Sequence, residues 1–221
     1  MPVRARRLAA ALLAIAALAG SAHAADPPVT MSRAEALDVL KRGDPQLKRR
    51  AVLWLGDVGT MDDVPILLAA LRDDDEWVRA VSEQSIWSIW GRSGDAKVDA
   101  LMRQGVQEME AGLLEQAVAT FTRVVRAKPA FAEGWNKRAT VHWLLGNHKA
   151  SLADCNEVMK RNPYHFGALA GYGQIWFALG DPQKSLDYFR KALALNPNMQ
   201  GVALSIEGLE RLLAEKRRRT I

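Results

Sequence analysis

The sequence of 221 residues contains one cysteine, Cys155, so no disulfide can form within the chain. Cys155 stands in a column of a repeat, described below, that has Phe121 in the preceding unit and Phe189 in the following one. Both neighbours are apolar, so we expect Cys155 to be a small buried residue. A reactive thiol or an intermolecular bridge is the alternative.

Motifs for catalysis and metal binding are missing as well. The chain has no Walker A, GxGxxG or GxSxG sequence. His142, His148 and His165 have neither a histidine nor a glutamate at the spacing of metal ligands. We therefore expect no enzyme, no cofactor, no metal site and no small-molecule substrate.

Long apolar runs are scarce, and the clearest one is Leu8 to Gly20. Arginines precede it, and the small residues of Ser21-Ala22-His23-Ala24 follow it, which is typical of a signal peptide over residues 1–24 that is cleaved near Ala24. The run is shorter than the roughly 20 residues that span a bilayer, although an uncleaved anchor is the alternative. We expect a periplasmic or secreted protein.

Between its two ends the chain also lacks an excess of basic residues. Its formal net charge of +5 includes the arginines of the predicted signal and the run Lys216-Arg217-Arg218-Arg219 near the C-terminus. Nucleic acid is therefore not an expected partner. The terminal run is either a solvated helix end or a peripheral contact with anionic lipid or an acidic partner.

Residues 25–30 form a linker with two prolines, and a helical block is predicted over residues 31–94. Ser32 is the expected N-cap of a helix that runs to about Lys41, and further helices are predicted over 47–59, 64–71 and 77–90. A shift of 31 residues aligns Leu37 with Leu68, Leu40 with Leu71, Asp44 with Asp75, Leu47 with Val78, Lys48 with Arg79 and Leu55 with Ile86. The block resembles HEAT-like repeats of the phycobilisome-lyase type, which occur mostly as scaffolds, so the resemblance implies nothing about lyase activity.

Acidic residues gather at the starts of these helices, namely Asp44, Asp73 to Asp75 and Glu76. We expect them to cap helix N-termini rather than to bind metal. The junction Gly91 to Asp95 is short, which predicts that the two blocks stack as one continuous superhelix.

A second repeat, with a period of 34 residues, covers 98–131, 132–165 and 166–199. Small residues let two helices approach, glycines end the first helix in a left-handed conformation, and prolines stop the second helix. The columns hold Leu101, Trp135 and Leu169; Gly105, Ala139 and Gly173; Gly112, Gly146 and Gly180; Ala117, Ser151 and Ser185; Phe121, Cys155 and Phe189; Val124, Val158 and Ala192; and Pro129, Pro163 and Pro197. This pattern is similar to that of the tetratricopeptide repeat (TPR) family.

The resemblance implies an all-α, right-handed α-α superhelical solenoid, in which the HEAT-like helices precede three TPR units. Residues 200–221 then form a capping helix with a basic tail. Its apolar face, at Val202, Ile206, Leu209 and Leu213, would close the last repeat.

In the TPR family the first helix of each unit lines a concave groove, which implies where a partner would bind. The groove positions here are Met102, Val106, Met109, Asn136, Thr140, Trp143, Ala170, Gln174 and Phe177. Large apolar groups beside a few amides suit a peptide or an amphipathic helix, so we predict a protein-binding scaffold. The groove could instead be filled by the tail helix, by a second copy or by tight curvature. The alternative function is a structural or membrane-peripheral subunit of an envelope complex, which makes its contact through the basic tail or a face of Trp77, Trp87 and Trp90.

One TPR subclass binds the C-terminal carboxylate of its partner through lysine and asparagine side chains. The matching positions here hold Met102, Val106, Lys137, Gly167 and Gly171. Only Lys137 is charged, so carboxylate-clamp binding is not expected.

Overall fold

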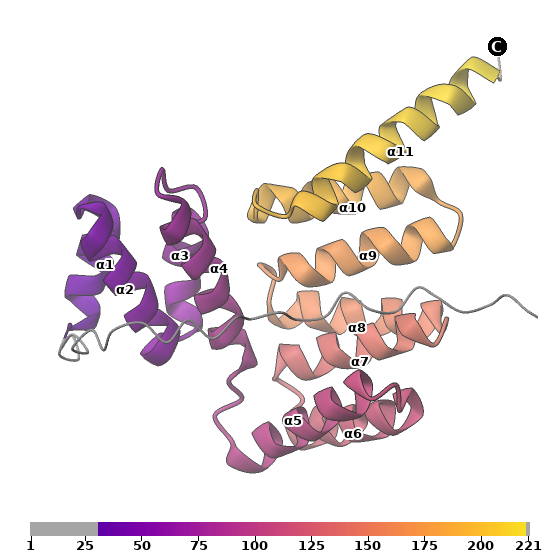
Figure 1. The fold of residues 1–221 in the computed structure, drawn as a ribbon. Coiled ribbons are helices and arrows are strands. Elements are labelled where there is room, and N and C mark those ends of the chain that lie inside the picture. The colour runs from indigo at the N-terminus through magenta and orange to yellow at the C-terminus, as the bar shows by residue number, and fades with distance from the viewer. Residues whose placement is uncertain (1–30, 220–221) are drawn as a thin grey trace, which may run out of the picture. The chain divides into compact units, whose positions relative to one another are not determined.

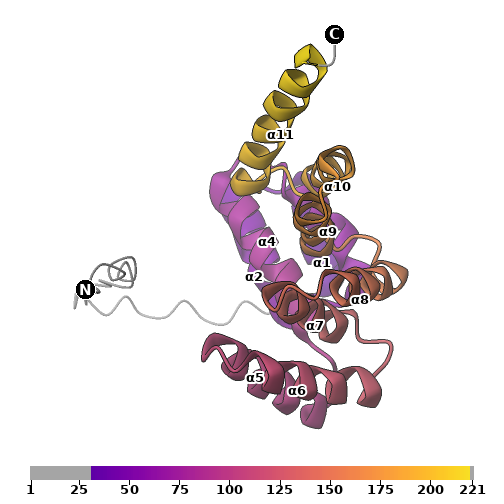
Figure 2. The same ribbon diagram turned by 90° about the vertical axis from the view of Figure 1, so that its right-hand side faces the viewer.

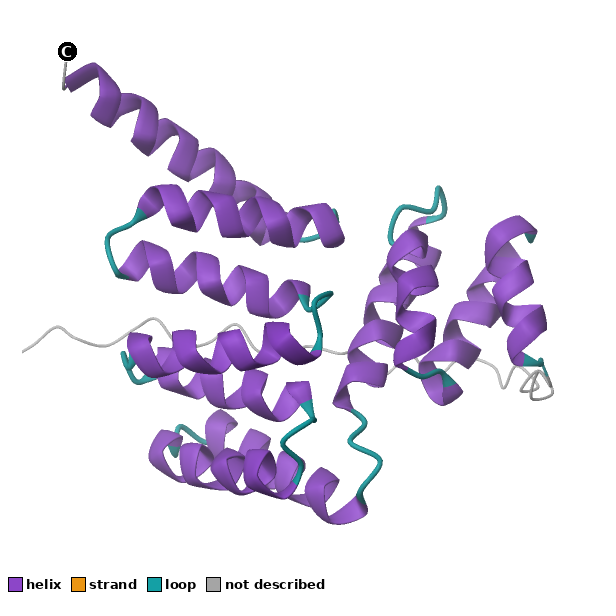
Figure 3. Cartoon of the chain, turned by 180° about the vertical axis from the view of Figure 1, so that it is seen from behind, coloured by secondary structure: helices purple, strands orange, loops and turns teal. Residues whose placement is uncertain are grey.

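The computed structural model describes residues 31–219 of the chain, and the predicted signal peptide and linker lie outside them. Every described element is a helix, as Figure 3 shows. The all-α solenoid predicted from the repeats is confirmed. Among the described helices, none combines the length and hydropathy needed to cross a membrane.

The N-terminal block, residues 31–94, contains four α-helices and one short 3₁₀ helix. Ser32 caps the first helix with a capping box: its Oγ accepts from the N–H of Glu35 at 3.2 Å, and its own N–H donates to the Glu35 carboxylate at 2.7 Å. The elements are α1 (Arg33–Arg42), α2 (Pro45–Val58), η1 (Met61–Asp63), α3 (Val64–Ala70) and α4 (Glu76–Gly91). Their positions match the helices predicted for this block within a few residues.

The repeat block, residues 98–199, consists of three helix pairs, and a final helix follows it (Figure 1). The helices are α5 (Ala96–Glu110), α6 (Leu114–Ala127), α7 (Ala132–Leu144), α8 (His148–Arg161), α9 (Phe166–Ala178), α10 (Pro182–Leu195) and α11 (Gln200–Arg219). Gly146 follows α7 with a φ of 74°, and Gly112 and Gly180 repeat this at 74° and 81°. The predicted left-handed glycine turn is therefore present in each unit.

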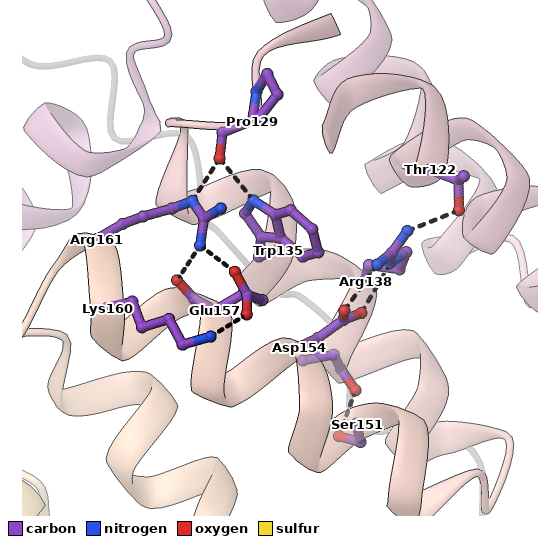
Figure 4. A network of polar contacts seen from close by, with 10 residues as sticks. Thr122, Pro129, Trp135, Arg138, Ser151, Asp154, Glu157, Lys160 and Arg161 are labelled. Atoms are coloured by element: carbon purple, nitrogen blue, oxygen red, sulfur yellow. Dashed lines mark hydrogen bonds and ion pairs between the residues drawn. The ribbon is translucent and has the colours of Figure 1, made fainter. Parts of the chain in front are cut away.

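Polar contacts fasten the two helices of a unit together. The buried Ser151 donates from Oγ to the carbonyl of Ala139 at 2.7 Å, and Ser185 does the same to Gly173 at 2.7 Å. Arg138 of α7 binds both carboxylate oxygens of Asp154 on α8, at 2.7 and 2.8 Å, and donates to Thr122 of α6 (Figure 4). Such a bidentate pair fixes direction as well as distance.

The N-terminal block does not stack on the end of the repeat block, so the predicted continuous superhelix is wrong. Helix α4 packs against α7, and Figure 1 shows α1 to α4 beside the repeat units, with α5 further away. Two causes are visible. Gly94, with a φ of 73°, turns the chain away from α4, and the aromatic side of α4 is buried against His165 and Phe166.

The surface that receives the N-terminal block is the row of turns that follow the second helix of each repeat unit. Lys128, at the first turn, donates to the carbonyl of Ser93. At the second turn the rings of Trp90 and His165 stack with their centroids 4.4 Å apart. At the third turn Asn198 donates to the carbonyl of Leu71 at 2.9 Å. One block therefore contacts three consecutive turns of the other.

Helix α11 covers the open face of the last repeat unit, as predicted. Val202 and Leu209 are buried in a cluster with Leu186 and Phe189. The end of α11 projects beyond α10, and Figure 2 shows this from the side.

Candidate functional site

The first helices of the three units, α5, α7 and α9, carry the predicted groove positions. Phe177 is 56% exposed, and Thr140 and Gln174 are also exposed. Val106, Met109, Asn136 and Trp143 are half-buried. These seven side chains offer surface to a partner, whereas partner binding itself stays a prediction.

Two of the predicted groove residues are buried, although Ala170 also lines the small hollow between α7 and α9 that is described below. Met102 is 8% exposed and packs in a cluster with Phe121 and Phe131. Ala170 is 9% exposed and packs in the cluster that includes Leu186 and Phe189. Their helix faces turn inward because the next helix covers them, which helical spacing alone does not reveal.

A large apolar hollow lies at the end of the groove, between α9 and α11. We call it the α9–α11 cleft. Its volume is about 590 Å³, within the range of roughly 300 to 1,000 Å³ that is usual for ligand sites. It is lined by Trp143, Gln174, Phe177, Ala178, Phe189, Ser205, Gly208, Leu209 and Leu212. Two columns of the predicted groove thus continue into a cleft whose far wall is the tail helix.

The wall formed by α11 was not predicted. Ser205, Gly208 and Leu212 recur at three- and four-residue spacing, which places them on one face of the helix. Because this face lies next to the predicted apolar face of the helix, the spacing could have revealed these three residues. The tail helix therefore caps the last unit without filling the groove.

A smaller hollow of about 120 Å³ lies between α7 and α9, with Asn136, Thr140 and Gln174 on its walls. Cys155 contributes to its floor and is 2% exposed. Burial raises the pKa of the Cys155 thiol to about 12, so the thiol stays protonated and unreactive at neutral pH. The expected buried role of Cys155 is confirmed.

The tryptophan face proposed as an alternative contact surface is mostly internal. Trp90 is 4% exposed, and Trp87 packs edge-on against Phe166 with ring centroids 5.3 Å apart. Only Trp77, at 39% exposure, is open. The N-terminal block uses Trp87 and Trp90 to bind the repeat block of the same chain, which corrects the prediction of a free tryptophan face.

The acidic residues at the helix starts act largely as predicted. Asp44 and Asp75 accept from the N–H groups of Leu47 and Val78 at 3.0 and 2.9 Å. Asp73 instead accepts from Lys48 at 2.7 Å. Within residues 31–218, no three histidine, cysteine or acidic side chains gather in a way that could hold a metal ion.

His165 is fully buried and caps α9. Its Nδ1 accepts from the N–H of Ala168 at 3.0 Å, so Nε2 carries the proton and donates to Glu133 at 3.0 Å. Lys137, the one charged residue at the clamp positions, pairs with the same glutamate at 3.3 Å. These groups satisfy one another and hold the second turn in place.

Two family models described as tetratricopeptide repeat match the chain, over residues 102–165 and 166–199. The two matches together cover residues 102–199, and they support the predicted resemblance to tetratricopeptide repeats for this part of the chain. The HEAT-like assignment of residues 31–94 stays a prediction, because the matches begin after that block.

The relatives align with about half of this chain. A TPR repeat-containing protein of Rhizobium etli is 32% identical over 108 residues, which are 49% of this chain and 53% of that protein. The small glutamine-rich tetratricopeptide repeat-containing protein of Dictyostelium discoideum is 27% identical over 125 residues, 56% of this chain and 37% of that protein. The chain therefore spans 53% and 37% of the length of these relatives.

Two solved structures have a similar fold. The Sgt2 TPR domain of Aspergillus fumigatus has a TM-score of 0.54 at 19% identity and covers 56% of this chain and 83% of its own. The first TPR of Spaghetti (RPAP3), bound to the HSP90 peptide SRMEEVD, has a TM-score of 0.52 at 21% identity and covers 54% of this chain and 96% of its own. At such identity the likeness establishes the helical-repeat fold alone.

Proposed function

We propose that this protein is an exported, non-enzymatic scaffold that binds a peptide or amphipathic helix of a protein partner in the TPR groove. The observation that carries the proposal is the α9–α11 cleft, an apolar hollow of about 590 Å³ that opens beside the exposed Phe177. An amphipathic helix could bury its apolar side there and leave its polar side in water.

The TPR fold supports binding of a protein rather than catalysis. The similar RPAP3 repeat holds an HSP90 peptide. Recognition here would differ, because the positions that match the carboxylate clamp carry one cation, Lys137, which is already paired with Glu133. Apolar contacts in the cleft, rather than a terminal carboxylate, would then supply the affinity.

A variant that fills the cleft without removing a contact tests this proposal. Apart from the local backbone and the chain neighbours, no heavy atom lies within 4 Å of a Cβ atom built on Gly208, which lines the cleft, or on Gly201 of the same helix, which does not. Gly208→Leu would place a side chain in the cleft, and Gly201→Leu is the matched control. Both variants should remain helical by circular dichroism, because leucine has a higher helix propensity than glycine.

Peptides selected on the wild-type protein from a random library would then be titrated against the three proteins. Gly208→Leu should weaken binding at least about ten-fold, which corresponds to about 1.4 kcal/mol, and Gly201→Leu should leave it unchanged. Equal affinity for all three proteins would show that the cleft is not the binding site.

Export rests on the N-terminal sequence, in which arginines, an apolar run and Ser21 to Ala24 follow one another. Expression of the full gene and N-terminal sequencing of the protein from the periplasmic fraction would test it. A chain that begins at Ala25 is expected, and recovery of an unprocessed chain in the cytoplasm would contradict export.

The second candidate function is that of a membrane-peripheral subunit. The observation that favours it is the exposed run Lys216, Arg217 and Arg218 at the end of α11. Truncation after Glu215 should reduce co-flotation with vesicles that contain anionic lipid. Unchanged flotation would remove the basic tail as the contact.

A further inference from the structure

A cavity of about 210 Å³ lies where the end of α4 meets the turns after α6 and α8. We call it the junction cavity. It has an apolar wall, formed by Met61, Ile89, Trp90 and Phe131, and a cationic wall, formed by Arg92, Lys128 and Arg161. It is separate from the groove, which is lined by the first helices and α11.

The cationic wall has a surplus of positive charge. Arg161 is paired with Glu157 at 2.6 Å and donates to the carbonyl of Pro129, which also accepts from Trp135 (Figure 4). Arg92 donates to the carbonyls of Gly56 and Gly59, and Lys128 donates to that of Ser93. Within residues 31–218, neither Arg92 nor Lys128 forms an ion pair with a carboxylate.

Two acidic side chains at the start of α5 accept bonds from backbone N–H groups. Asp95 accepts from the N–H groups of Lys97 and Val98 at 2.8 and 3.2 Å, where it caps α5. Asp99 accepts from the N–H of Ser93 at 3.1 Å. These bonds hold both carboxylates at the start of α5, and neither residue lines the cavity. The N–H groups of Val98 and Lys97 lower the pKa of Asp95 most, and the charge of Lys128 contributes without a direct ion pair.

Two buried donors on the cavity lining lack a partner among the described residues. The indole N–H of Trp90 is one, on a side chain that is 4% exposed. The amide nitrogen of Asn162, which is 1% exposed, is the other, because its Oδ1 accepts from the N–H of Tyr164 at 3.2 Å. Both nitrogen atoms have almost no accessible surface, so neither faces the open part of the cavity directly. A buried donor without an acceptor is unfavourable, so a turn of the Asn162 amide toward an acceptor in the cavity would be favoured.

We propose that the junction cavity binds a small organic carboxylate with a compact apolar body. The carboxylate would accept from Lys128 and from the amide of Asn162, and the apolar body would pack on Trp90 and Phe131. A cavity of about 150 Å³ holds benzene, so the volume here is sufficient for benzoate. An inorganic anion would leave the apolar wall without contacts.

Calorimetric titration of the purified full chain with benzoate, benzamide and inorganic phosphate tests the chemistry of the ligand. Benzoate should bind at least about ten-fold more tightly than benzamide, which has the same body without the charge. Phosphate should bind more weakly than benzoate. Equal affinity for benzoate and benzamide, tighter binding of phosphate, or no binding of benzoate would each overturn the proposal.

An isosteric substitution tests the location. Asn162→Asp keeps the acceptor for Tyr164 and replaces the unpartnered donor by a carboxylate oxygen, which would act as a resident anion. Benzoate binding should be lost and the melting temperature should rise. Asn196 makes the same turn in the next unit, with its Oδ1 accepting from Asn198 at 3.0 Å, but it does not line the cavity. Asn196→Asp should therefore leave benzoate binding unchanged.

Lys128→Met provides a second variant that removes the cation and keeps an apolar stem. It should weaken benzoate binding at least about ten-fold, whereas Lys149→Met on the exposed side of α8 should not. If Asn162→Asp fails to fold, the comparison of Lys128→Met with Lys149→Met tests the proposed site. Benzoate binding that neither Asn162→Asp nor Lys128→Met weakens would contradict the proposed site.

Discussion

A Cβ atom built on Gly173 would lie 2.5 Å from the ring of Phe189, closer than real Cβ atoms approach a neighbour. Gly105 has the same relationship to Phe121, at 2.6 Å. In these two units, a missing side chain on the first helix makes room for an aromatic ring on the second.

Gly173→Ala should therefore lower the free energy of unfolding by about 1 to 3 kcal/mol, because the ring of Phe189 must move in a packed core. Chemical denaturation would measure the loss. Gly201→Ala is the control, since nothing outside the local backbone lies within 4 Å of its Cβ position, and it should be neutral or stabilise the protein by up to about 1 kcal/mol. Similar losses in both variants would contradict the steric explanation.

The middle unit has the opposite arrangement, with Ala139 on the first helix and Cys155 on the second, in one cluster. Cys155→Phe should cost about 1 to 3 kcal/mol in the wild-type background through overpacking. The same substitution should cost less in the Ala139→Gly background, with a coupling energy of about 1 kcal/mol or more in a double-mutant cycle. Additive effects would show that the two positions do not share this space.

Glu133 should make the free energy of unfolding fall at acidic pH. Burial acts to raise the pKa of Glu133, but the bond to His165, the charge of Lys137 and the bond to Asn136 outweigh it and hold the pKa below its ordinary value of 4.5. A carboxyl whose pKa is lower in the folded state than in the unfolded state stabilises the fold at pH values above the unfolded-state pKa. This stabilisation is lost as the pH falls through the folded-state pKa.

Glu133→Gln should thus reduce the free energy of unfolding at neutral pH by about 1 to 3 kcal/mol and flatten its decline below about pH 4.5. Urea denaturation at several pH values would measure both effects. Glu115→Gln, on the exposed surface of α6, should leave the pH profile unchanged. A wild-type profile in the Glu133 variant would exclude this residue as a source of the acid sensitivity.

Trp90 should hold the two blocks together. Trp90→Ala should lower the free energy of unfolding by about 3 to 5 kcal/mol and raise amide exchange at the start of α9, where Trp90 stacks on His165. Trp77→Ala on the same helix is the control, and its effect should stay below about 1 kcal/mol because Trp77 is 39% exposed. Equal effects would contradict the role of Trp90 at the junction.

Local structure followed closely from the sequence because its causes lie within a few residues of one another. Ser32, Asp44 and Asp75 cap the helices that their positions predict. The glycine turns and the packing columns recur with the 34-residue period, so each unit supports the prediction for the others.

The arrangement of the two blocks could not be predicted in the same way. A repeat pattern specifies the neighbour along the chain, whereas Trp90 finds its partner His165 across a long separation in sequence. An apolar side of α4 could equally have faced a second protein. The wall of the cleft at Leu212 was missed for a related reason, since it depends on the angle at which α11 leaves α10.

The contacts of the N-terminal block with three successive turns also affect how the chain folds. An array of repeats usually folds through nearest-neighbour contacts, so that units can open one at a time. Here Leu71 bonds to Asn198 across 127 residues, and Arg72 bonds to Leu195 across 123. Such contacts raise the contact order, so folding should be slower than for an isolated array. They also couple the outer units, so that the protein should unfold in one cooperative step.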